Sequence, residues 1–241
     1  MDTPILELVK VNKTFRLDLL KPKHQALKDI SCSFKTGTAS AVMGHNGAGK
    51  TTSMRTILGL ISADSGQVLF KGKPIVTEDR RSIGYMPETN KLPGELRSQE
   101  LLYFHLNLYK PQLSRKDKHA LVEEKLTQVG LSQKHKGARI STLSKGLGRR
   151  LAWAMASIHE PELLILDEPF TGMDPLGRRD LSAWIGAHMG KGASVIITTH
   201  ELDVAYALCS RFLIYKEGQI VYDGLSDLNE AKVLSFFGGS L

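Results

Sequence analysis

The chain has 241 residues, a formal net charge of +7 at pH 7, and ordinary shares of charged residues, glycine and proline. A chain of this length and composition can bury a sizeable core, so we expect one or two globular domains rather than intrinsic disorder. The basic balance favours an anionic partner such as a nucleotide, a nucleic acid or a phospholipid surface, although a solvated basic face explains it equally well.

The two cysteines and the lengths of the apolar runs further limit the classes of protein to which this chain can belong. Cys32 and Cys209 lie far apart in apolar surroundings, which predicts neither a disulfide framework nor a CxxC metal pair. No run approaches 18 apolar residues, and the N-terminal sequence MDTPILELVK matches neither a secretion leader nor a myristoylation pattern. We therefore expect a reduced, cytosolic chain that neither spans a membrane nor is exported by itself.

Strand patterns and helix patterns alternate along the chain in blocks. Short β-type runs crowd the first 75 residues, in ILELVKV, ISCSF, TASAVMG and GQVLFKG, and predict a mixed sheet before the first helix. From about Ser98 to Ile158 the apolar residues follow helical spacing, in SQELLYFHLNLY, KDKHALVEEKLTQV and RRLAWAMASI, which predicts an all-helical insert.

Sheet signals resume after the helical insert. The runs at 163–166, 194–199, 211–215 and 219–223 predict strands separated by helical stretches, as in βα units. The continuous apolar run LLIL predicts a central strand buried on both faces. The C-terminal sequence NEAKVLSFFGGSL predicts a terminal helix and a frayed tail.

The segment GHNGAGKT, residues 44–51, matches GxxxxGK[ST] and stands between a buried strand and a helix expected to begin near Lys50. Glycines allow successive backbone N–H groups to point at phosphate oxygens, and the helix N-terminus adds partial positive charge. We expect Lys50 to bridge the β- and γ-phosphates and the Thr51 hydroxyl to ligate Mg²⁺. A ligand-free glycine turn is the alternative, and the flanking strand and helix argue against it. The expected nucleotide-binding residues here are Gly44, His45, Asn46, Gly47, Ala48, Gly49, Lys50, Thr51 and Thr52.

An acidic pair, Asp167 and Glu168, follows the buried run LLIL. Mg²⁺ is a hard cation that prefers oxygen ligands, so we expect Asp167 to hold it through water. Glu168 is placed to orient and deprotonate an attacking water. The alternative is a strand-end pair that is merely solvated. The phosphate-binding loop upstream, residues 44–52, which we call the cradle, argues strongly against this alternative.

The remaining motifs resemble those of the nucleotide-binding subunits of ABC transporters. LSKGL, 143–147, followed by GRR, is similar to that family's LSGGQ signature, and TGMDP, 171–175, resembles its D-loop. IGYMPE, 83–88, resembles the family's Q-loop. His200 resembles its switch histidine, and Phe15 resembles the aromatic residue whose ring stacks on adenine. Taken alone, a histidine such as His200 is more often an ordinary surface or core residue than a phosphate sensor, and a phenylalanine such as Phe15 more often packs in a core than stacks on adenine. Together the motifs occur once each and in family order, so the resemblance covers essentially the whole chain.

This resemblance implies an α/β fold: a P-loop NTPase, RecA-like core with an N-terminal antiparallel β-subdomain and an inserted α-helical subdomain. It implies a single ABC ATPase domain over residues 1–241. Residues 1–87 and 159–241 would form the core, and residues 88–158 would form the helical subdomain that carries the signature.

The resemblance also implies a mechanism that needs two chains. Ser144 and the N–H group of Gly146 would bind the γ-phosphate of ATP held by a second ATP-binding subunit, either an identical copy or a close homologue. His200 would contact the γ-phosphate and keep water and Glu168 aligned, and Asp174 would couple the two sites. ATP binding would close the dimer, and hydrolysis would remove the charge that holds it shut.

Two positions depart from the family pattern. Glu88 stands where glutamine is typical; its carboxylate can still reach Mg²⁺ but adds negative charge near the γ-phosphate, which predicts slower or more tightly gated turnover. Lys145 replaces the first signature glycine and Leu147 the glutamine. Lys145 either faces the γ-phosphate or points to solvent, and the sequence leaves both open.

As partners, the resemblance implies integral membrane permease subunits. They would dock on residues 88–97 and on the following helix, where four successive apolar residues at 101–104 cannot all face one core. The chain would then lie at the cytoplasmic face of the cell membrane, with no nucleic acid partner. Lysine in the signature together with Glu88 looks most like ABC-2-type exporters, which favours export over import.

Three points stay open. The basic segment 16–25 either approaches anionic headgroups or a partner, or forms a solvated hairpin. A soluble ABC-type ATPase of the iron–sulfur assembly type is the main alternative function. A GTPase or small-molecule kinase is a weaker one, because NKLP at 90–93 lacks the aspartate of a guanine-reading NKxD.

Overall fold

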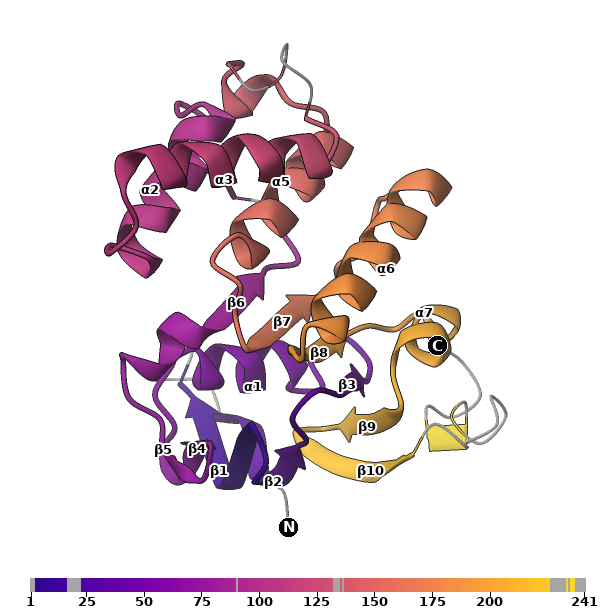
Figure 1. The fold of residues 1–241 in the computed structure, drawn as a ribbon. Coiled ribbons are helices and arrows are strands. Elements are labelled where there is room, and N and C mark those ends of the chain that lie inside the picture. The colour runs from indigo at the N-terminus through magenta and orange to yellow at the C-terminus, as the bar shows by residue number, and fades with distance from the viewer. Residues whose placement is uncertain are drawn as a thin grey trace.

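The computed structural model describes residues 3–16, 23–89, 91–131, 135, 137–225, 233 and 235–236. Most of the predicted C-terminal helix and tail and most of the basic segment 16–25 lie outside the described residues. Two β-sheets and a group of helices make up the described fold (Figure 1).

The first sheet is antiparallel and has the strand order β2-β1-β4-β5. Its strands are β1 (Leu6–Phe15), β2 (His24–Phe34), β4 (Ser65–Phe70) and β5 (Lys73–Pro74). In β1 the side chains of Leu6 and Leu8 are buried and alternate with more exposed neighbours, as expected for a sheet with one face against the core. This sheet is the predicted N-terminal antiparallel subdomain.

The second sheet has six strands in the order β10-β9-β3-β8-β7-β6. They are β3 (Ala39–Met43), β6 (Ile83–Met86), β7 (Leu163–Asp167), β8 (Ser194–Thr198), β9 (Arg211–Lys216) and β10 (Gln219–Leu225). All pairings are parallel except β9 with β10. Every residue of β3, β7 and β8 is buried, which confirms the predicted central position of LLIL.

Two strand predictions were wrong in detail. The run TASAVMG does not join the early strands in one mixed sheet, because β3 is buried at all five positions and needs cover on both faces. No helix separates the last two strand runs: β9 and β10 form an antiparallel hairpin. Glu217 and Gly218 connect them with φ angles of 50° and 80°, the left-handed pair that a tight hairpin turn of matching twist requires.

Among the described residues, the helical insert contains α2 (Ser98–Tyr109), α3 (Arg115–Gln128) and α5 (Lys145–Ser157), with the short turn η2 (Ile140–Thr142). Figure 1 shows these helices grouped away from the antiparallel sheet and joined to the rest through β6 and β7. On α2, Leu101 and Leu102 are buried whereas Phe104 is 58% exposed. The predicted apolar surface on this helix is therefore present.

The other helices flank the second sheet. They are α1 (Lys50–Ile57), α6 (Pro175–Gly190), α7 (Leu202–Leu208) and the turn η1 (Asp79–Ser82). Leu6 of the first sheet, Met54 of α1 and Ile165 of the second sheet belong to one buried cluster, so α1 is packed between the two sheets (Figure 1). Among the described residues, no helix combines the length and the apolar character needed to cross a bilayer.

Strand register positions the functional residues. Asp167 at the end of β7 pairs with Thr198 at the end of β8, and Val42 near the end of β3 pairs with the same threonine. The carboxyl ends of three neighbouring parallel strands therefore meet at one edge of the sheet, where open α/β sheets bind their ligands.

Candidate nucleotide-binding site

The loop between β3 and α1 depends on its glycines. Gly44 and Gly49 have φ angles of 149° and 109°. A Cβ atom at Gly44 would lie 2.5 Å from the Tyr215 carbonyl oxygen, and one at Gly49 would lie 2.7 Å from that of Ala26. Larger residues would therefore disrupt the loop. Gly49 is also the N-cap of α1 and supplies no side-chain cap, so the N-terminus of this helix faces the loop without a side-chain acceptor.

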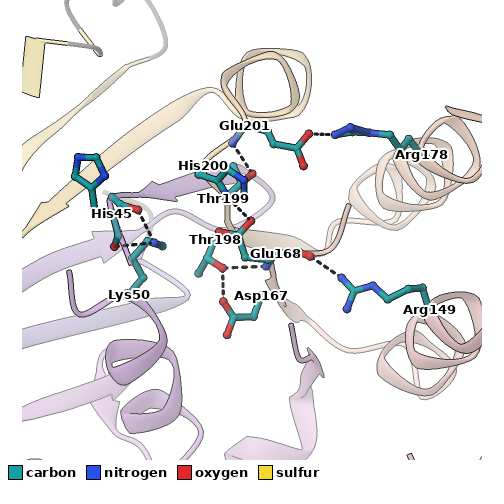
Figure 2. Close-up of polar contacts among 11 residues, drawn as sticks. His45, Lys50, Arg149, Asp167, Glu168, Arg178, Thr198, Thr199, His200 and Glu201 are labelled. Atoms are coloured by element: carbon teal, nitrogen blue, oxygen red, sulfur yellow. Dashed lines mark hydrogen bonds and ion pairs between the residues drawn. The ribbon is translucent and has the colours of Figure 1, made fainter. Parts of the chain in front are cut away.

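Lys50 is only 7% exposed and turns back into the loop. Its Nζ donates to the carbonyl oxygens of Gly44, at 2.5 Å, and His45, at 3.3 Å (Figure 2). Burial lowers the pKa of Lys50, and the nearby carboxylates, Glu168 foremost, act in the opposite direction. A buried ammonium held by neutral carbonyls forms stronger, charge-assisted hydrogen bonds when an anion enters its reach.

Thr198 organises the acidic pair. Its hydroxyl donates to Asp167 Oδ1, and the Glu168 backbone N–H donates to the Thr198 carbonyl at 3.0 Å and lies 3.1 Å from its Oγ1 (Figure 2). Asp167 is 2% exposed. A single residue at the end of β8 therefore fixes both the Asp167 carboxylate and the Glu168 backbone.

Glu168 has a φ angle of 46°, an unfavourable conformation for a residue with a side chain. Its side chain is largely buried, and Oε2 lies 3.0 Å from His200 Nδ1. Among the described residues, this oxygen has no hydrogen bond of good geometry. His200 is itself exposed at the end of the loop after β8, so the carboxylate and the imidazole meet at the mouth of the site.

These residues enclose one pocket of about 240 Å³. It brings together most of the predicted cradle and hydrolytic residues and one that sequence reasoning did not select, Thr171. The lining residues are Gly44, His45, Asn46, Lys50, Thr51, Glu88, Asp167, Glu168, Thr171 and His200.

Phe15 lines a second pocket of about 180 Å³ beside the same loop. This pocket is lined by the loop and the start of α1, residues 45–52, together with His24 and Ala26. Lys13 Nζ lies 5.6 Å from the centroid of the Phe15 ring. The structure therefore places the predicted adenine-stacking ring next to the cradle, and with it His24, which the motif search did not select.

The signature residues do not line the cradle pocket of their own chain. Ser144 is the N-cap of α5, where its Oγ accepts from the Leu147 N–H group at 3.3 Å. A Cβ atom added to Gly146 would meet nothing within 4 Å, so this turn faces open space. Ser144 lines a neighbouring pocket of about 480 Å³, which shares Glu88 and Thr171 with the cradle pocket.

Lys145 and Asp174 both lie at the start of a helix, Lys145 on α5 and Asp174 as the N-cap of α6. The exposed Lys145 side chain runs along the segment between β7 and α6, with Nζ 2.7 Å from the position of a Cβ atom added to Gly172. It does not line the cradle pocket of its own chain. Asp174 is the N-cap of α6, and its Oδ1 accepts from the Gly177 N–H group at 2.6 Å.

Arg149 was not selected as a functional residue from the sequence. It is 2% exposed and donates to the carbonyl oxygens of Pro87, Glu88 and Glu168 (Figure 2). An arginine in the second turn of a helix that packs into the core is a signal that could have identified it, because a buried cation needs partners.

The donor set suits Mg²⁺. Among the described residues, no group of three or more His, Cys, Asp or Glu side chains could hold a metal ion alone. Thr51, Asp167 and Glu88 nevertheless line the same pocket as the cradle. Mg²⁺ typically takes one or two carboxylates and completes its shell with water and substrate phosphates, so these oxygen donors fit it.

Comparisons with known proteins agree with this geometry. The sequence model of the family described as ABC transporter matches residues 27–171. The Nod factor export ATP-binding protein I of Bradyrhizobium diazoefficiens is 31% identical and aligns with 100% of this chain and 78% of its own length. The uncharacterized ABC transporter ATP-binding protein YxlF of Bacillus subtilis is 34% identical, over 89% of this chain and 71% of its own.

A Synechocystis relative, also described as an ABC transporter ATP-binding protein, is 30% identical, and this chain spans 62% of its length. Among solved structures, the ATP-binding subunit of an ABC transporter superposes with a TM-score of 0.83 at 28% identity, covering 98% of this chain and 94% of that one. The cbiO1 protein of Clostridium perfringens gives a TM-score of 0.79 at 26% identity, covering 100% and 96%. The fold is that of the ABC ATPase cassettes, and the chain belongs to the ATP-binding family of ABC transporters.

Proposed function

We propose that this chain binds and hydrolyses ATP at the interface of a head-to-tail dimer and so drives transport through integral membrane permease subunits. One observation carries the proposal: a single pocket joins Lys50 and Thr51 of the cradle to Asp167, Glu168 and His200. A site that only binds nucleotide needs the cradle. A second carboxylate beside the metal-binding one is the feature that hydrolysis requires.

The cradle would hold the triphosphate. Backbone N–H groups of residues 44–49 and the Lys50 ammonium would grip the β- and γ-phosphates. Thr51 and Asp167 would hold Mg²⁺, with Glu88 within the same pocket; when bound, the ion neutralises charge on the phosphate oxygens. The Phe15 ring beside the loop is proposed to stack on adenine.

Glu168 would act as the general base. Its Oε2 lies inside the pocket beside His200 and can accept a proton from a water molecule as that water attacks the γ-phosphorus and ADP leaves. His200, with Nδ1 3.0 Å from this oxygen, would orient the carboxylate and contact the γ-phosphate. The contacts that fix the left-handed backbone of Glu168 would keep the carboxylate at this point.

A second chain would complete the site. Ser144 and Gly146 stand at an open helix N-terminus outside the cradle pocket of their own chain, which suits binding of the γ-phosphate presented by another subunit. Asp174 would couple the two sites through the start of α6, which it caps. We propose that residues 1–87 and 159–241 act as the core of one domain and residues 88–158 as its helical subdomain.

The names of the relatives guide the choice of partner. Several similar proteins are described as Nod factor export ATP-binding proteins, and cbiO1 is described as part of the transporter complex cbiONQ. We therefore propose export, with permease subunits docked on α2 near Phe104 and Leu108, which are 58% and 52% exposed. The chain would then lie at the cytoplasmic face of the membrane. The soluble iron–sulfur assembly alternative has no specific observation in its favour.

Glu168→Gln tests the proposal. In the variant, ATP should still bind with Mg²⁺ and the dimer should accumulate, because only the base is lost, while phosphate release should fall by about 10² to 10⁴-fold. Glu162→Gln is the matched control, since Glu162 pairs with Lys71 at the surface and should leave the rate unchanged. Phosphate release and analytical ultracentrifugation measure both quantities. The proposal would be refuted if the Glu168→Gln variant hydrolysed ATP at the wild-type rate, or if it remained monomeric at saturating ATP and Mg²⁺.

The transport partner needs a separate experiment. A tagged chain should copurify from detergent-solubilised membranes with an integral membrane protein. Recovery with a soluble scaffold instead would contradict the transporter assignment while leaving the hydrolytic site intact.

A further inference from the structure

Arg149 connects three backbone segments with one side chain. It lies on α5, five residues after Ser144, and its side chain is almost wholly enclosed. Nη1 donates to the carbonyl oxygens of Pro87, at 2.9 Å, and Glu88, at 2.7 Å. Nη2 donates to the Glu168 carbonyl at 2.5 Å (Figure 2). The helix that begins at the signature is thereby joined to the exit of β6 and to the exit of β7.

The contact to Glu168 falls on a backbone that needs support. Glu168 has a left-handed φ, a conformation that persists only where surrounding contacts fix it. On its N–H side the contacts come from Thr198. On its carbonyl side Arg149 donates at 2.5 Å, and the Thr171 N–H group makes a longer contact at 3.3 Å. Without the guanidinium, only the longer contact from Thr171 would hold the Glu168 carbonyl, and a rotation of this peptide would displace the carboxylate that faces the pocket.

The residue type suits the task. A guanidinium carries several N–H donors in a planar fork, so it can serve carbonyls from two segments at once, whereas a lysine offers one point charge. Burial lowers the pKa of Arg149, and nearby carboxylates, Glu88 foremost, raise it; an arginine remains charged in either case. The fixed fork geometry, more than the charge, is what a lysine cannot reproduce.

We propose that Arg149 is a positioning residue for hydrolysis, which fixes the backbones of Glu168 and of residues 87–88 and links the signature helix to the hydrolytic carboxylate of its own chain. The proposal rests on the proposed function, because it assigns Arg149 to the step that Glu168 performs. It has a further consequence for a dimer: the helix whose N-terminus binds ATP held by the partner would also hold the base of its own site.

Kinetics of Arg149→Lys and Arg149→Gln, in the full chain with its permease, test the proposal. A base displaced by about 1 Å loses roughly 10² in rate, so we expect kcat to fall by about 10 to 100-fold in Arg149→Lys and further in Arg149→Gln. The Kd for ATP should stay within about twofold, because the cradle does not touch Arg149. Arg150→Lys is the matched control, since Arg150 binds Asp180 and the Val129 carbonyl away from the pocket.

Measurements of dimer formation and of melting temperature distinguish a positioning role of Arg149 from a role in folding or in dimerisation. In a Glu168→Gln background, Arg149→Lys should still form the ATP-dependent dimer, and its melting temperature should match that of Arg150→Lys within a few degrees. An unchanged kcat in Arg149→Lys, an equal loss in kcat and in ATP affinity, or loss of the dimer in the double variant would each overturn the proposal. Failure of the proposed function is distinguishable, because then the wild type itself would not hydrolyse ATP.

Discussion

A pair of histidines, His159 buried and His105 partly buried, makes the stability of this protein depend on pH. His105 of α2 and His159, between α5 and β7, face each other with Nε2 of one 3.0 Å from Nδ1 of the other. Tyr109 stacks on His105 with ring centroids 4.1 Å apart, and His159 is 2% exposed. The pair therefore lies where the helical insert meets the parallel sheet, and both rings are neutral in the folded protein.

The magnitude follows from the two pKa values. Burial lowers the pKa of His105 to about 4; burial, with smaller contributions led by His105, lowers that of His159 to about 3. In the unfolded chain both have a pKa of about 6.5. Between these values the unfolded chain binds protons that the folded chain does not, so stability falls as the pH falls below 6.5. At pH 5 the loss is about 2 kcal/mol per histidine, or about 4 kcal/mol for the pair, relative to pH 7.5.

Urea unfolding at pH 7.5 and pH 5.0 measures this loss. For a chain of this size, about 4 kcal/mol corresponds to a drop in Tm of roughly 8 to 16 °C. The variant His105→Gln/His159→Asn should lose the part of the pH dependence that this pair contributes. The buried His188 of α6, whose pKa burial also lowers, should still contribute in the same direction, whereas carboxylates with lowered pKa values, such as Glu160, titrate below this window. His119→Gln, at an exposed position on α3, should keep the wild-type dependence. A wild type whose unfolding free energy is the same at both pH values would contradict the inferred burial of uncharged imidazoles.

Two further substitutions probe the nucleotide site. Glu88→Gln should raise the ATPase rate a fewfold, because it removes a negative charge from the pocket; an unchanged rate and Mg²⁺ dependence in a steady-state assay would show that Glu88 does not gate turnover. Gly49→Ala should destabilise the protein by about 1 to 3 kcal/mol and weaken ATP binding, since its φ is left-handed and its Cβ would meet the Ala26 carbonyl at 2.7 Å. Gly186→Ala, where a Cβ meets nothing within 4 Å, is the thermal-unfolding control, and equal melting temperatures would refute the predicted clash.

The strands that the sequence predicted best are those whose signal is local. A run such as LLIL is apolar at every position, and only a strand covered on both faces accounts for it at that length. The β9–β10 hairpin escaped prediction because its turn is Lys216-Glu217-Gly218-Gln219, without the Asn-Gly or Asp-Gly that marks such turns. Glu217 takes a left-handed φ that its residue type gives little reason to expect.

In the candidate site, too, the residues with a local sequence signal could be predicted and those without one could not. The cradle and the acidic pair could be predicted because each is a contiguous motif whose residue types follow from phosphate and Mg²⁺ chemistry. Thr198 and Arg149 could not, because both act on the backbone of Glu168 from far away in the chain: Thr198 lies 30 residues from it and Arg149 lies 19 residues from it. Moreover, Arg149 binds carbonyl oxygens, which every residue carries, so no side-chain pattern at the receiving positions reveals the contact.

The beginning of α5 makes two contacts with the segment between β7 and α6, and they bear on the unusual signature. Lys145 lies along Gly172, and Arg149 holds the carbonyl of Glu168. If residues 143–147 are the signature, as proposed, a lysine in place of its first glycine does more than change the charge at a surface, because the Lys145 stem packs on Gly172, in the loop that ends at Asp174. If α5 shifts when a second chain docks at Ser144, both contacts shift with it, and the loop bearing Glu168 receives the displacement directly through packed atoms rather than through the distant sheet core.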